Sequence, residues 1–159
     1  MTTDDLFQQA LSKLLTEILD GAPAGESYAL NPGDPGLLAQ LDTISAATAS
    51  QRPMPGKTTI AAHVDHVHYG LSLFNRWAQG EANPWATSDW EASWKRGHVN
   101  EQQWTELRAK LRQASEAWQQ AVRARDQWDQ TSAPGALASA VHTAYHLGAI
   151  RQILAATGG

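Results

Sequence analysis

Residues 58–80 read TTIAAHVDHVHYGLSLFNRWAQG, and the spacing of their apolar side chains indicates the fold class. Apolar residues recur at alternating intervals of four and three positions, at Ile60, Val64, Val67, Leu71, Phe74 and Ala78. In an α-helix this spacing puts them on one face, which then packs against other helices. Thr58 or Thr59 is suited to cap the start of the helix, and Gly80 is suited to end it. We therefore predict a long core helix here.

Three further long helices are predicted from similar patterns. The first runs from Thr3 to Leu19, with Thr3 as its N-cap and a leucine-rich stripe along one face. Another begins at Asn100, where Gln103 is placed to complete a capping box. The last runs from about Pro134 to Thr157. Because no segment alternates apolar and polar residues with period two, we expect no sheet and predict an all-α four-helix bundle.

The connections between these helices also carry signals. A short helix is expected from about Asp34 to Ala46, with Asp34 as its N-cap. The connector before Asn100 is rich in tryptophan, with one short helix and the residues Trp85, Trp90 and Trp94. These rings either cap the end of the bundle, which is the simpler interpretation, or form one wall of a substrate pocket.

Length and composition limit the classes of function. The 159 residues predict a single domain over 1–159. The chain has no cysteine, which excludes disulfides, thiolate metal sites and cysteine nucleophiles. A net charge of −4 argues against nucleic acid or an anionic membrane as partner. No apolar run is long enough to span a membrane, and the polar start MTTDDLFQQ does not resemble a signal peptide, so a cytoplasmic protein is expected.

Five of the six histidines fall in two clusters on predicted core helices. His142 and His146 are one helical turn apart, on a stripe that continues through Ala149, so both rings point along the buried side. On the helix that begins near residue 58, His63 lies near the centre of the apolar arc. His66 lies about 60° further round it. Three or four inward imidazoles on two helices favour a shared divalent cation over separate buried histidines.

Three neutral imidazoles would leave one coordination position open, which is the arrangement of a catalytic metal site. Zinc, nickel and iron(II) all accept imidazole ligands, and spacing alone does not choose among them. Nor does spacing decide whether His63 or His66 joins His142 and His146.

The segments HTAYHLGAIRQ (142–152), TIAAHVDHV (59–67) and GEANPWATSDWEASW (80–94) resemble the DinB/YfiT-like superfamily. The resemblance spans essentially the whole chain and implies a bundle in up-down-down-up order, with short extra helices in the connections. It also implies a divalent metal, zinc or nickel ahead of iron(II), held by His66, His142 and His146. His63 would then lie behind the ligands or in the core. This chain departs from the pattern at Ala149, where many members have Gln.

The resemblance further implies a homodimer that acts on a small molecule. Members with known activity include S-transferases that use low-molecular-weight thiols, and a metal with an open position can deprotonate such a thiol. One alternative is a metal-dependent hydrolase, although no Glu on the His142 stripe could serve as general base. The other is a non-enzymatic helical dimer with a structural or vestigial metal site.

Overall fold

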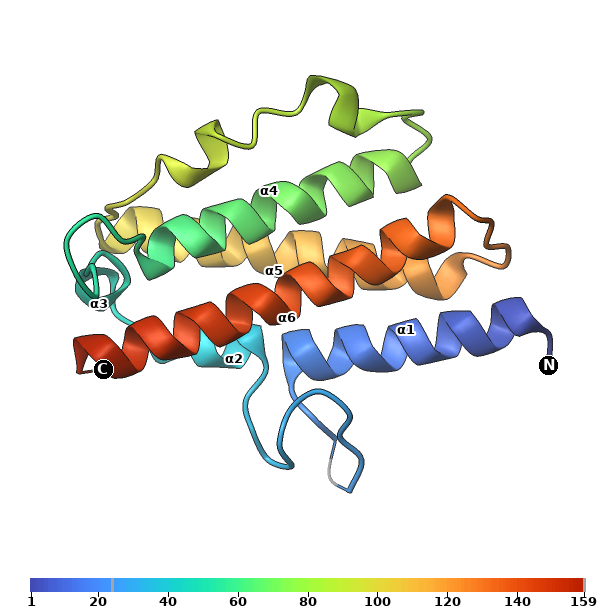
Figure 1. The fold of residues 1–159 in the computed structure, drawn as a ribbon, viewed down its shortest axis with the longest axis horizontal. Helices are drawn as coiled ribbons and strands as arrows, with labels where there is room; N and C mark the ends of the chain where they lie inside the picture. Colours follow the sequence, from blue (N-terminus) through green and yellow to red (C-terminus); the bar gives the residue numbers. More distant parts are fainter. Residues whose placement is uncertain (24, 159) are drawn as a thin grey trace.

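The computed structural model describes residues 1–23 and 25–158, which form a helical bundle (Figure 1). Its elements, in chain order, are α1 (Thr3–Asp20), α2 (Leu37–Asp42), α3 (Ala46–Ala49), α4 (Ile60–Ala78), the 3-10 helices η1 (Pro84–Thr87) and η2 (Ala92–Trp94), α5 (Glu101–Ala124) and α6 (Ser132–Thr157). Helices α1 and α6 run in one direction and α4 and α5 in the other, which is the predicted up-down-down-up order. The described residues contain no strand, so the all-α prediction is confirmed.

The ends of the long helices follow their capping residues, with small corrections to the predicted bounds. The N-cap of α1 is Thr2 rather than Thr3, because Thr2 and Asp5 form a reciprocal capping box. The predicted box between Asn100 and Gln103 is present at the start of α5. Helix α6 begins at Ser132, two residues before the predicted Pro134. At its start the Asp129 carboxylate accepts the N–H groups of Thr131, the N-cap, and of Ser132, the first helical residue.

The single short helix predicted from Asp34 to Ala46 is wrong in its extent. The structure has two shorter helices there, α2 and α3, and Ser45 caps the second by accepting the N–H of Thr48. Asp34 does not cap a helix; its carboxylate instead pairs with Arg151 of α6 at 3.2 Å. The connector after α4 likewise holds two short 3-10 helices rather than one.

The core lies between the four long helices. It includes the predicted apolar stripe of α4 from Ile60 to Phe74, and two tryptophans of α5 whose ring N–H groups find partners. The last residue of that stripe, Ala78, is exposed, so the stripe ends one turn earlier than predicted. Trp104 donates to the Ile44 carbonyl at 2.6 Å, and Trp118 donates to Ser139 Oγ at 2.8 Å. Helix α4 contacts both α5 and α6, and the connector with η1 and η2 runs back along the outer side of α4 (Figure 1). Within the described part of the chain, no helix combines the length and hydrophobicity needed to cross a bilayer.

Candidate metal centre

Three imidazole nitrogens converge where α4 faces α6. Nε2 of His142 lies 3.1 Å from Nε2 of His66 and 3.0 Å from Nε2 of His146. The three residues each offer a ligand atom, and these atoms all lie within 4.8 Å of one another. For comparison, nitrogen ligands about 2.1 Å from a zinc ion at tetrahedral angles are about 3.4 Å apart. The structure thus brings together the three histidines predicted as metal ligands, in an arrangement that fits a divalent cation.

The local sequence explains how the rings meet. His142 and His146 are one turn apart on α6, and α4 brings His66 from the opposite side. His66 and His146 are buried, whereas His142 is half-buried. Gly70 lies one turn after His66, and a Cβ built there would be 3.4 Å from Cε1 of His142. The small residue at position 70 therefore leaves room for the His142 ring against α4.

Hydrogen bonding fixes which nitrogen of His66 is free to bind a metal. Its Nδ1 lies 2.7 Å from Ser93 Oγ, and the Ser93 hydroxyl donates to the Trp90 carbonyl at 2.6 Å. Since that hydroxyl proton is already used, Ser93 Oγ accepts the Nδ1–H of His66, which leaves the lone pair on Nε2. Metal-binding histidines usually have such a partner for the other ring nitrogen.

His63, the alternative ligand left open by spacing, lies beside the three converging nitrogens and does not belong to their group. Its Nδ1 faces Nδ1 of His146 at 2.8 Å, and its Nε2 lies 3.2 Å from Thr58 Oγ1. The position of His63 therefore agrees with a place behind the ligands, as the resemblance implied.

In a comparison with models of protein families, the model described as DinB superfamily matches residues 36–150. The chain belongs to the DinB superfamily. The match includes all three converging histidines, His63 and the whole tryptophan-rich connector, and it leaves out α1. No curated protein and no solved structure matches the chain.

The electrostatics of this DinB-superfamily site keep its imidazoles neutral. Burial lowers the pKa of His66 to about 4, and the neighbouring His142 and His63 add to the effect. Burial, together with the other three histidines, lowers the pKa of His146 to about 3. Burial also lowers the pKa values of His63 and His142. At neutral pH the lone pairs are therefore available, and neutral imidazole is the form that binds metals.

Two of the three connector tryptophans pack directly against the site. Trp94 stacks on His66 with ring centroids 4.1 Å apart and an angle of 22° between the planes. Trp90 lies against both His66 and His142, at 5.3 and 6.3 Å. Trp85 instead contacts Phe74, away from the histidines. For Trp90 and Trp94 the interpretation that they cap the end of the bundle is therefore wrong, because their rings lie against the histidines on the side of α4.

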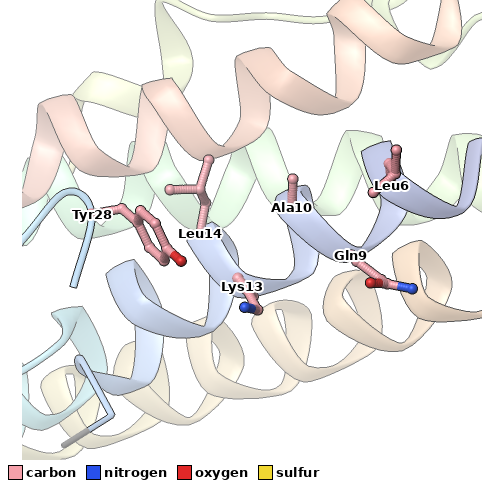
Figure 2. A pocket seen from close by; sticks show the side chains of 6 residues that line it. All are labelled: Leu6, Gln9, Ala10, Lys13, Leu14 and Tyr28. Atoms are coloured by element: carbon pink, nitrogen blue, oxygen red, sulfur yellow. The ribbon is translucent and has the colours of Figure 1, made fainter. Parts of the chain in front are cut away.

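A second candidate site among the described residues is a hollow on α1, away from these histidines. The hollow in Figure 2 has a volume of about 330 Å³ and lies on α1, beside the segment that carries Tyr28. Its walls are Leu6, Gln9, Ala10, Lys13, Leu14 and Tyr28. With Lys13 as its one charged side chain and no metal-ligating group, it is a weaker candidate than the histidine site.

Sequence reasoning missed three residues that shape the site: Thr58, Gly70 and Ser93. Ser93 and Thr58 lie outside the long helices, where no periodicity places them in space. The one available signal was chemical, since each buried imidazole needs partners for both ring nitrogens.

Proposed function

We propose that this DinB-superfamily protein binds a divalent metal ion through His66, His142 and His146 and transfers a low-molecular-weight thiol to a small electrophile. The observation that carries the proposal is the convergence of three neutral Nε2 atoms without a fourth ligand. Among the described residues, no Asp, Glu or further His joins the group. Three imidazoles without a fourth protein ligand are typical of catalytic rather than structural sites.

When bound, a divalent ion with an open position supplies Lewis acidity that lowers the pKa of a thiol. The protein needs no cysteine of its own, and it has none. The thiol would lose its S–H proton to solvent, and its sulfur would form the new bond to carbon as the leaving group departs with its electron pair. Trp90 and Trp94 would limit access of water, because their rings cover His66 and part of His142.

Hydrolysis fits the same three ligands less well, because a general base is needed near the metal. The carboxylate closest in sequence to His66 is Asp65, and it forms an ion pair with Arg96 at 3.1 Å rather than joining the histidine group. Thiol transfer does not require such a base once the thiol is ionised.

The test begins with untagged protein, its metal content measured by elemental analysis, and a cobalt-substituted form titrated with small thiols. A sulfur-to-cobalt charge-transfer band that is absent from His66→Ala and retained in His98→Ala supports the proposal; His98 is exposed and lies outside the site. Turnover of activated esters without such a band would favour the hydrolase. Metal-dependent melting with neither activity would favour a structural metal, and a wild-type protein that binds no metal would refute all three.

A further inference from the structure

His63 is a buried fourth imidazole that the metal set does not use. It lies one turn before His66 on α4 and is only 7% exposed; its ring is nearly perpendicular to that of Trp94, with 5.2 Å between the ring centroids. We propose that His63 is a positioning residue that fixes the tautomer and orientation of His146, with Thr58 fixing His63 in turn. This inference rests on the proposed metal centre, but it does not depend on the reaction that takes place there.

The directions of the hydrogen bonds follow from metal binding by Nε2 of His146. A neutral imidazole has one N–H, so a lone pair on Nε2 places the proton of His146 on Nδ1. That Nδ1–H faces Nδ1 of His63 at 2.8 Å, which must then accept it. His63 consequently has its own proton on Nε2, directed at Thr58 Oγ1 at 3.2 Å.

The opposite arrangement would prevent metal binding by His146. If His63 donated through Nδ1, then Nδ1 of His146 would accept and its proton would occupy Nε2, the atom that faces His142. Thr58 would then have to donate to Nε2 of His63. Only one of the two arrangements leaves a lone pair for a cation, and binding of a cation should select it along the whole chain from His146 to Thr58.

The partner of His146 differs from the usual one. Metal-binding histidines commonly donate to a carboxylate or a backbone carbonyl. Here the acceptor is a ring nitrogen of His63, which unlike a carboxylate adds no negative charge behind the ligand. With Tyr145 against one side of the His146 ring, the bond to His63 holds that ring toward His66 and His142.

A matched pair of variants tests this role. In His63→Asn the amide oxygen takes the place of Nδ1 and can still accept, whereas His63→Leu has nearly the same shape and cannot. Zinc affinity would be measured by competition with a chromophoric chelator. We expect a loss of about 10–100-fold in His63→Leu, the range found for partners behind metal-binding histidines. We expect His63→Asn to remain close to wild type and Thr58→Val to show a smaller loss than His63→Leu.

Nuclear magnetic resonance of the zinc-loaded wild type gives a second readout that requires no variant. Long-range ¹H–¹⁵N spectra should show His146 protonated at Nδ1 and His63 protonated at Nε2. Unchanged zinc affinity in His63→Leu, equal losses in the Leu and Asn variants, or a His63 proton on Nδ1 would each overturn the inference while leaving the metal centre standing. A wild-type protein that binds no zinc would instead overturn the metal centre, and this inference with it.

Discussion

Gly70 offers a way to disturb one proposed ligand while leaving the other two in place. A Cβ added at this position would lie 3.4 Å from Cε1 and 3.5 Å from Nδ1 of His142. These are ordinary van der Waals distances, so alanine should fit without moving the ring. Because alanine is favoured over glycine inside a helix by about 1 kcal/mol, Gly70→Ala should raise the free energy of unfolding by up to that amount. Its zinc affinity should remain that of the wild type.

Gly70→Val should have the opposite effect on the site. Each methyl group extends about 1.5 Å beyond Cβ, so one directed at the ring would come within about 2–2.5 Å of His142. Carbon atoms pack at about 3.5–4.0 Å, and valine in a helix has one strongly preferred rotamer, so the His142 ring would have to turn away. Zinc affinity should then fall by more than about 100-fold, since loss of a partner behind a ligand already costs about 10–100-fold.

The assay is chelator competition for zinc affinity together with thermal or urea unfolding for stability. Gly148→Val is the matched control, because Gly148 lies on α6 two residues after His146 and a Cβ there meets no atom within 4 Å. A Gly70→Val protein that folds and binds zinc as tightly as the wild type would refute the assignment of His142 as a ligand in this geometry.

Three further outcomes are expected. His66→Ala should lose bound metal by elemental analysis while His98→Ala retains it, and equal metal in both would contradict the assignment of His66. In the folded protein the pKa values of His66 and His146 are about 4 and about 3, below the 6.5 of an unperturbed histidine. As the pH falls below 6.5, these two histidines are therefore protonated in the unfolded chain before they are protonated in the folded one, which favours unfolding. Urea unfolding of metal-free protein should therefore show full stability above pH 6.5 and a decline toward pH 4, and a flat profile there would count against buried neutral rings. Val141 is 68% exposed and lies on an outward face of α6 that has no charged residue, so we propose that a homodimer forms through this face. Val141→Glu should then reduce the mass measured by light scattering from that of a dimer to that of a monomer. A wild-type protein that is already monomeric would refute the dimer.

The sequence predicted best those parts of the site that lie within one helix. His142 and His146 are four residues apart, and helical geometry alone places them side by side. Helical geometry alone does not decide whether His63 or His66 is the third ligand, because both lie on the inner arc of the same helix. How α4 lies against α6 decides which of the two reaches Nε2 of His142, and single-helix periodicity does not contain that information.

The connections were harder to predict than the helices for a related reason. The short helix expected to begin at Asp34 assumed that this carboxylate caps a helix, yet it pairs with Arg151, which is 117 residues away in sequence. Ser93 acquires its role only because the connector runs back along α4. Both outcomes depend on contacts between segments distant in sequence, which local propensity does not encode.

Different parts of the chain supply the proposed metal ligands and the residues that orient them. Helices α4 and α6 supply the three proposed ligands. Segments outside the long helices supply Ser93, which links His66 to the Trp90 carbonyl, and Thr58, which is linked to His146 through His63. A change in either connection could thus alter the orientation of a ligand without changing the bundle that carries it. Because precise orientation controls metal affinity, differences in chemistry between proteins with this bundle would be expected to arise in these connections before they arise in the core.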